Sequence, residues 1–311
     1  MTTFSIELPA LDGRTPLGFL AALGLLRVCA DVCRMPTALS FSDSTACAIL
    51  HSPCETAEEI AEALRGVIES IPESAILPDG GAGFPPPSGV GKDPLRRSRE
   101  EFHQLATNHP EAAETWLPSL VTDLALDKQE RCAITLFTAP SGKQTLQTFF
   151  AKPLEAVRGR PERLLEALVG WRRVEGVTGE YLDHRVLRSN SDDPEGRAGR
   201  ESGVPGATWL ATMALPLLRI TGDGQRVRTT LWHRRRSGPV MLWPLWRPAL
   251  NTLAVRCLLE HPVFAPVDHV PTVSSTHWPA LGVINVYGAE RQRIPGRTFD
   301  GVLSPLPVKL L

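Results

Sequence analysis

Hydrophobic and polar residues follow different periods along this chain, and the change of period predicts where its strands and helices lie. Residues 3–8 (TFSIEL) alternate with period two, as in a strand with one buried face. Residues 16–34 are apolar nearly all round, which is typical of a helix at the centre of a core. Thr15 and Pro16 suit the N-cap and the first position of that helix. The N-terminus therefore predicts a strand followed by a buried helix.

The same reasoning assigns most of the remaining chain to helices and short strands. Helical spacing of apolar residues predicts helices at 55–71, 99–106, 111–125, 143–157, 160–171, 205–215 and 249–261. Alternating stretches between turn residues predict strands at 38–43, 46–52, 132–137, 226–234 and 239–246, and a last hairpin at 282–288 and 291–296. We expect an α+β fold, with small antiparallel sheets packed with several helices, a buried N-terminal helix and a C-terminal β-hairpin region.

Glycine and proline mark the boundaries between parts of the chain. Residues 74–95 are rich in Gly, Pro and Ser and are interpreted as a loop or linker. They separate an N-terminal α+β unit, 1–73, from a helical and β-hairpin region, 96–311, which we expect to share one core with it. The polar stretch 174–204 is long for a loop in a compact domain, and such loops are often functional or disordered.

Composition narrows the class of protein. The chain has 311 residues, 42% of them hydrophobic, and a net charge of −1, so no polyanion-binding field covers the whole surface. Charge is uneven: residues 55–73 hold six acidic residues and one arginine, whereas residues 219–247 hold seven arginines and one aspartate. The six scattered cysteines suit buried free thiols in a reducing cytoplasm. Neither a secretory leader nor a membrane span is apparent, so we expect a cytoplasmic protein.

The basic segment contains the stretch WHRRRSGPVMLWPLW, residues 232–246, which allows two interpretations. Arg234, Arg235 and Arg236 would project from a hairpin tip and contact phosphates, with Trp232 stacking on a base. Alternatively, the stretch is a structural hairpin with a charged tip, and at least one of its tryptophans belongs to the core. On regular strand geometry, Trp243 and Trp246 would face opposite sides.

Two other basic sites are candidates for backbone contacts. The Arg172–Arg173 pair follows Trp171. Lys143 and Gln144 lie at the expected start of a helix, where free N–H groups bind phosphate or are simply capped. An ATP-binding loop is not expected there, because that motif requires glycine at position 137 and Ser or Thr at position 144.

One acidic cluster is a candidate for catalysis. Glu180, Asp183 and His184 occur within GEYLDHR, and a metal site or an acid–base pair requires such side chains. The alternative is a solvated, salt-bridged loop. Cys29 and Cys33 lack a second pair of zinc ligands, and no nucleophile motif accompanies the serines. We expect no cofactor and no metal, and enzymatic activity stays uncertain.

Five stretches, in the same order, resemble a known family. They are LDGRTPLGFLAALGLLRV (11–28), FTAPSGKQTLQTFF (137–150), GEYLDHR (179–185), PGATWLATMALPLL (205–218) and GPVMLWPLW (238–246). They resemble CRISPR-associated proteins of bacterial type I-G systems (earlier I-U), namely the large subunit and the extension linked to the helicase–nuclease. The helicase and nuclease motifs themselves do not occur here.

The resemblance implies a non-catalytic component of an antiviral defence complex. Its partners would be guide RNA or target DNA, neighbouring effector subunits or the helicase–nuclease, and no membrane. Two alternatives stay open. One is a metal-dependent hydrolase or nuclease that uses Glu180, Asp183 and His184. The other is a protein-only scaffold whose acidic helix, 55–73, docks a basic partner.

Overall fold

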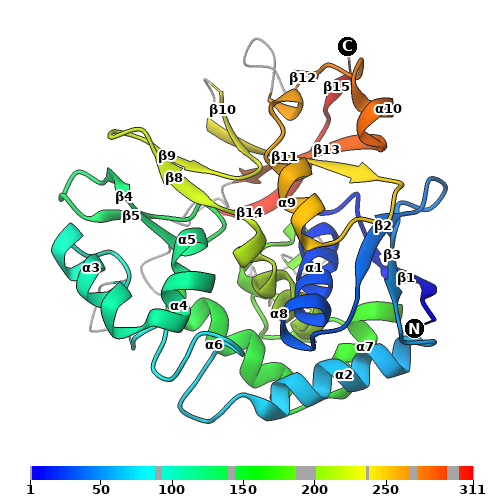
Figure 1. Cartoon of the computed structure of the whole chain (residues 1–311), viewed down its shortest axis with the longest axis horizontal. Coiled ribbons are helices and arrows are strands. Elements are labelled where there is room, and N and C mark those ends of the chain that lie inside the picture. The colour runs from blue at the N-terminus through cyan, green and yellow to red at the C-terminus, as the bar shows by residue number, and fades with distance from the viewer. Residues whose placement is uncertain are drawn as a thin grey trace, which may run out of the picture.

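A buried pair of helices forms the centre of the molecule. This computed structural model describes residues 2–87, 93–138, 144–186, 201–235, 238–265, 272–292 and 301–310. All residues of α1 (Pro16–Arg27) are buried, and α8 (Pro205–Met213), equally buried, packs along it (Figure 1). A Cβ at Gly24 would lie 1.7 Å from the carbonyl oxygen of Leu210, so this close approach of the two helices requires glycine. The predicted buried N-terminal helix is confirmed, and it continues as a π-helical turn, Val28–Val32.

A small antiparallel sheet packs beside α1. Its strands lie in the order β1 (Phe4–Asp12), β3 (Cys47–Ser52) and β2 (Ala38–Phe41), which confirms the three strands predicted near the N-terminus. Alternation places Leu8 and Leu50 in the core, whereas Ser5 and His51 stay at the surface side.

Three helices lie beneath this centre, at the bottom of Figure 1. They are α2 (Ala57–Ser70), α6 (Leu146–Arg158) and α7 (Glu162–Val169). Ile60 and Leu64 of α2 are buried, while its glutamates face outward. All three were predicted from helical spacing.

One predicted helix, 111–125, is wrong in its second half. The chain forms α4 (Pro110–Thr115) and the single turn α5 (Leu117–Leu120), and then the strand β4 (Val121–Leu126). Pro118 has no N–H to continue the helix that precedes it, and it sits instead in the first turn of α5. The β-branched Val121 and Thr122 that follow favour extended backbone, and β4 pairs with β5 (Cys132–Ile134).

The strand predicted at 226–234 is two strands. Leu231 has a φ of 72°, a left-handed conformation that interrupts regular pairing. β9 (Val227–Thr229) pairs with β8 (Ile220–Gly222), whereas β10 (Trp232–Arg235) pairs with β11 (Gly238–Trp246). The β10–β11 hairpin confirms the predicted C-terminal hairpin region.

The last predicted hairpin, 282–296, is wrong. Residues Val283–Gln292 form one long strand, β13, which lies between β11 and β14 (Val302–Leu306) in the sheet β10-β11-β13-β14. The turn expected at residues 289–290 does not form, because Ala289 and Glu290 pair within the strand. Gly288 also lies in the strand, where a Cβ would be 2.8 Å from Val308, so its small size serves close packing.

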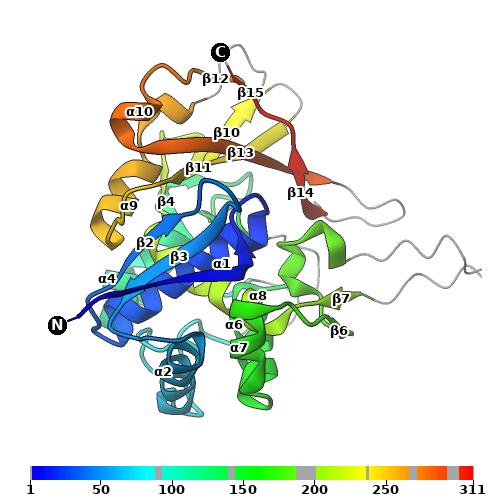
Figure 2. The same ribbon diagram turned by 90° about the vertical axis from the view of Figure 1, so that its right-hand side faces the viewer.

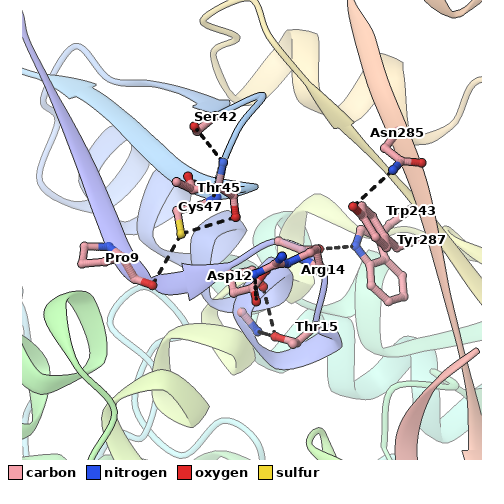
Figure 3. Close-up of polar contacts among 12 residues, drawn as sticks. Pro9, Asp12, Arg14, Thr15, Ser42, Thr45, Cys47, Trp243, Asn285 and Tyr287 are labelled. Carbon is pink, nitrogen blue, oxygen red and sulfur yellow. Dashed lines mark hydrogen bonds and ion pairs between the residues drawn. The ribbon is translucent and has the colours of Figure 1, made fainter.

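This sheet lies next to α1 and the N-terminal strands (Figure 2), and two tryptophans of β11 contact that unit. Trp243 stacks on Phe19 with ring centroids 5.6 Å apart, and its indole N–H donates to the carbonyl of Gly13 at 2.8 Å (Figure 3). Trp246 lies 6.3 Å from Phe19 and donates to the carbonyl of Leu39. The expectation that Trp243 and Trp246 face opposite sides is wrong, because a register shift between Leu245 and Trp246 breaks the alternation.

The Gly/Pro-rich stretch 74–95 is packed against the core where it is described. Leu77, Phe84 and Leu95 are fully buried, although residues 74–87 and 93–95 form no helix or strand. One cluster of buried side chains contains residues from both sides of this stretch. The remaining elements are α3 (Arg99–Asn108), α9 (Thr252–Leu259), α10 (Trp278–Leu281), β6 (Val174–Glu175), β7 (Ser202–Gly203), β12 (Thr272–Val273), β15 (Lys309–Leu310) and short 3-10 turns.

The cysteines are free thiols with unequal burial. Cys29, Cys47 and Cys132 are buried, whereas Cys257 is exposed. Across the described ranges, no helix is long and apolar enough to cross a membrane.

Candidate nucleic-acid-binding site

The structure separates two of the three arginines predicted at the hairpin tip, Arg234 and Arg235. Arg234 is exposed on β10, as expected. Arg235 is not: its side chain is only 12% exposed and forms an ion pair with Glu290 of β13. Strand alternation explains the difference, since neighbouring residues of β10 point to opposite faces, and Arg235 contacts Glu290 two strands away in the same sheet. Arg236 lies outside the described residues.

Trp232 is part of the core rather than an exposed stacking platform. It is 8% exposed, contacts Phe137 edge-on at 5.8 Å, and has the guanidinium of Arg291 6.0 Å from its ring. Trp243 and Trp246 are also buried, so all three tryptophans of the segment serve packing. The expectation that Trp232 is available for a base to stack on its face is therefore wrong.

Carboxylates remote in sequence neutralise much of the basic segment. Arg219 pairs with Glu260 at 3.4 Å, Arg247 with Asp43 at 2.8 Å, and Arg235 with Glu290. Arg228 pairs with Asp223, within the segment, at 3.4 Å. Arg226 and Arg234 have no carboxylate partner in the part of the chain that the structure describes. The basic segment therefore has fewer arginines without a carboxylate partner than its sequence suggests. We call Arg226 and Arg234 the open arginines.

The open arginines border one cavity, which we call the arginine hollow. It has a volume of about 390 Å³ and lies between β9, β10 and the start of β11. Its lining comprises Leu136, Asp223, Arg226, Val227, Arg228, Trp232, His233, Arg234 and Pro239. Three arginines and one aspartate therefore surround a surface that also has apolar walls.

His233 gives the hollow a neutral polar group. Burial lowers the pKa of its imidazole to about 4, so the ring is uncharged at neutral pH. A neutral imidazole has one hydrogen-bond donor and one acceptor. The hollow thus combines charged, apolar and hydrogen-bonding surfaces, which makes it a candidate ligand site among the described residues.

Sequence reasoning missed Arg226, Arg228 and His233. A signal was present: Arg226 and Arg228 are two residues apart in a predicted strand, so their side chains share a face. The prediction was based on the run of three adjacent arginines, but adjacent residues in a strand point to opposite faces.

The second basic candidate, Arg172–Arg173, is divided in the same way. The Arg172 side chain is 80% exposed and lies 3.8 Å from Glu166. Arg173 points inward and donates to Asp183 at 2.5 Å and to the carbonyl of Ser202 at 2.8 Å. Only Arg172 of this pair is open to a phosphate, so the expectation for Arg173 is wrong.

The start of α6 is capped from within the chain. The Thr145 side chain accepts from the N–H of Thr148, and the N–H of Leu146 donates to Asp93 at 2.9 Å. Gln144 is buried and donates to Glu180, so the expectation that Gln144 is exposed is wrong. Lys143 lies outside the described residues. These contacts favour the capping interpretation over phosphate binding.

The acidic candidates form two separate sets of contacts, one around Glu180 and one around Asp183. We call the five residues Gln144, Arg173, Glu180, Asp183 and Arg185 together the Asp183 cluster. Asp183 is buried and accepts from Arg173 and, at 3.1 Å, from Arg185. Glu180 is also buried, but it accepts from Gln144 and from Thr178 at 3.1 Å. The two carboxylates thus bind different partners. The salt-bridged alternative fits, although the cluster is buried rather than solvated.

The pKa shifts in this cluster follow from its contacts. Burial raises the pKa of Glu180, and the hydrogen bond from Gln144 offsets only part of this effect. Burial acts on Asp183 in the same direction, but Arg173 and Arg185 outweigh it and hold its pKa below the ordinary value. Burial lowers the pKa of His184, whose Nδ1 lies 3.5 Å from Asp183. Among the residues described, no three His, Cys, Asp or Glu side chains are placed to hold a metal ion.

Comparison of the chain with protein-family models and with curated proteins gave no match.

Proposed function

We propose that this chain is a non-catalytic CRISPR-associated component that contacts guide RNA or target DNA and neighbouring subunits. The resemblance of the five sequence stretches supports the family assignment. The single observation that supports nucleic-acid contact is the arginine hollow, where Arg226 and Arg234 lack carboxylate partners among the described residues. Arginines that are not neutralised internally are available to phosphates.

The exposed arginines would provide affinity for the backbone without reading sequence. Arg226, Arg228 and Arg234 would hold phosphates at the hollow, and Arg172 would provide a separate contact on another face. Arg173, Arg235 and Gln144 would position neighbouring groups instead, because their polar atoms are engaged inside the chain.

The metal-dependent hydrolase has less support. Both carboxylates of the Asp183 cluster are buried and hydrogen-bonded to side chains of the chain itself. A reacting group would have to displace those partners. The protein-only scaffold stays an outcome of the test below, and the family assignment is checked by whether CRISPR-associated genes adjoin this one.

Binding of labelled oligonucleotides tests the proposal. Single-stranded RNA, single-stranded DNA and duplex DNA are titrated between about 50 and 200 mM salt. Changing Arg226 and Arg234 together to Ala is expected to weaken binding about tenfold at low salt. The log–log salt slope should become shallower by about 1.4, since each single-strand phosphate contact contributes about 0.7.

A charge-matched control changes Arg65 and Arg160 to Ala. Both are exposed, and they lie on or next to α2 and α6, at the opposite end of the molecule from β10 (Figure 1). This variant should bind like the wild type. The assignment of the hollow fails if the two double variants bind alike. If the wild type shows no salt-sensitive binding, nucleic-acid contact is excluded and the protein-only scaffold is the alternative that stays.

A further inference from the structure

We infer that the arginine hollow captures one unstacked base of a single-stranded nucleic acid, with the adjoining phosphates on Arg226, Arg228 and Arg234. This inference rests on the proposed function and adds the form of the ligand. It depends on three properties of the hollow: its size, its walls and the position of its charges.

The size fits a small planar group rather than a helix. The cavity of about 390 Å³ lies at the lower end of the range of small-molecule sites, about 300–1,000 Å³. A double helix presents its phosphates on the outside and keeps its bases stacked. A duplex would therefore contact only the rim, whereas a free base can enter.

The walls fit a base because they are apolar with one neutral polar group. Leu136, Val227, Pro239 and the edge of the core at Trp232 supply contact area. His233 supplies a donor and an acceptor, and its ring nitrogens have no hydrogen-bond partner in the described ranges. Base edges carry both kinds of hydrogen-bonding group, so they complement this imidazole.

The arginines border the cavity on more than one side. A nucleic-acid strand whose base enters the cavity would have phosphates on both sides of that base, so this placement of charge suits it. Arg228 lies on β9, Arg226 directly precedes that strand, and Arg234 lies on β10. Asp223 lies on the same border, but it accepts from the amides of Gln225 and Arg226 and pairs with Arg228. It therefore holds the β8–β9 turn and offsets one arginine of three.

Entry of a base favours single strands. A duplex must break stacking and pairing to release a base, at a cost of a few kcal/mol, whereas a single strand has little to break. Contact between a base and protein side chains then adds affinity that does not depend on salt.

The test compares strands that share one backbone. Four labelled ligands of equal length are titrated into the wild-type chain: an ordinary single strand, a strand without bases, that strand with one central base, and a duplex. We expect the strand with one base to bind about tenfold more tightly than the strand without bases. The duplex should bind like the strand without bases. The salt slope should be the same for all three single strands.

A filled hollow provides a second test. Leu136→Trp adds bulk at a half-buried wall and leaves every arginine in place, whereas Leu253→Trp makes the same change at an exposed position of α9. The Leu136 variant should bind the one-base strand no better than the strand without bases. The Leu253 variant should behave like the wild type. If the Leu136 variant does not fold, the ligand series on the wild-type chain still decides.

The outcomes separate this inference from the proposed function. Equal binding of strands with and without bases would overturn base capture but keep backbone contact. Equal competition by a free nucleoside monophosphate would also overturn it, since the ligand would then be a nucleotide and not a strand. No salt-sensitive binding by any strand would remove the proposed function itself.

Discussion

Two charged regions of this molecule differ in whether their charged side chains have partners within the chain. In the Asp183 cluster, Arg173 and Arg185 meet Asp183, and Gln144 meets Glu180, so every named group has a partner inside the chain. In the arginine hollow, Arg226 and Arg234 border a cavity and lack carboxylate partners among the described residues. In the first arrangement, removal of one partner would destabilise the fold, because it would leave a buried charge unpaired. The second leaves charge for a ligand.

The comparison shows why local charge is a poor guide to a binding surface. The segment 219–247 is strongly basic in sequence, yet Glu260, Glu290 and Asp43 neutralise three of its arginines from distant positions. Among the described residues, Arg226 just before β9 and Arg234 on β10 have no carboxylate partner, and the left-handed residue Leu231 lies between them in the chain. Which charges stay open depends on tertiary contacts.

The largest expected effect is loss of stability in the Asp183 cluster. Asp183→Ala leaves Arg173 and Arg185 without their carboxylate, and the free energy of unfolding should fall by about 3–5 kcal/mol because Arg173 is largely buried. Chemical denaturation measures the change. In the exposed pair Asp43–Arg247, the matched change Asp43→Ala should cost less than about 1 kcal/mol. Similar losses in both would contradict the distinction.

A smaller effect is expected from His233 when the pH falls. Its pKa is about 4 in the folded chain and about 6.5 when unfolded, so the unfolded state binds the proton first as the pH decreases. Stability contributed by the neutral ring is present above pH about 6.5 and is lost toward pH about 4, by about 3 kcal/mol. Denaturation of the wild type and His233→Asn across this range measures it. The difference between them should change with pH, and a constant difference would contradict the shift.

The smallest expected effect comes from removing the carboxylate that pairs with Arg235, next to Arg234 of the hollow. Glu290→Gln keeps the shape of the side chain but removes the charge that neutralises Arg235. Affinity for a single strand at low salt should rise about twofold to fivefold, and the salt slope should steepen by at most about 0.7. Glu260→Gln, the partner of the more distant Arg219, is the control. An equal gain from both would mean that general charge, rather than the hollow, governs binding.

Much of the fold could be predicted from the sequence because it depends on local patterns. The apolar run of α1, its Thr15 cap and the β10–β11 hairpin all follow from neighbouring residues. The errors arose in segments whose residues favour different secondary structures. Residues 111–125 begin as a helix, but Pro118 interrupts it and β-branched residues follow. Residues 282–296 were predicted as a hairpin, but Val283–Gln292 form one strand in which Gly288 allows close packing.

The candidate site was predicted only in part. Arg234 and the adjacent strand were identified, whereas Arg226, Arg228 and His233 were not. Arg235, Trp232 and Gln144 were expected at the surface, and each is mostly buried and engaged with residues far away in sequence. Residue type alone does not distinguish an arginine that binds a ligand from one that binds a glutamate two strands away.

The sequence by itself determined the helices and strands whose signals lie within a few residues, and with them the α+β class. The tertiary structure alone decided which arginines stay open, that Trp243 and Trp246 dock on the same side, and that a cavity forms beside His233. The physical reason is range. Helix caps and alternation act between near neighbours, whereas burial and charge pairing depend on residues that folding brings together from opposite ends of the chain.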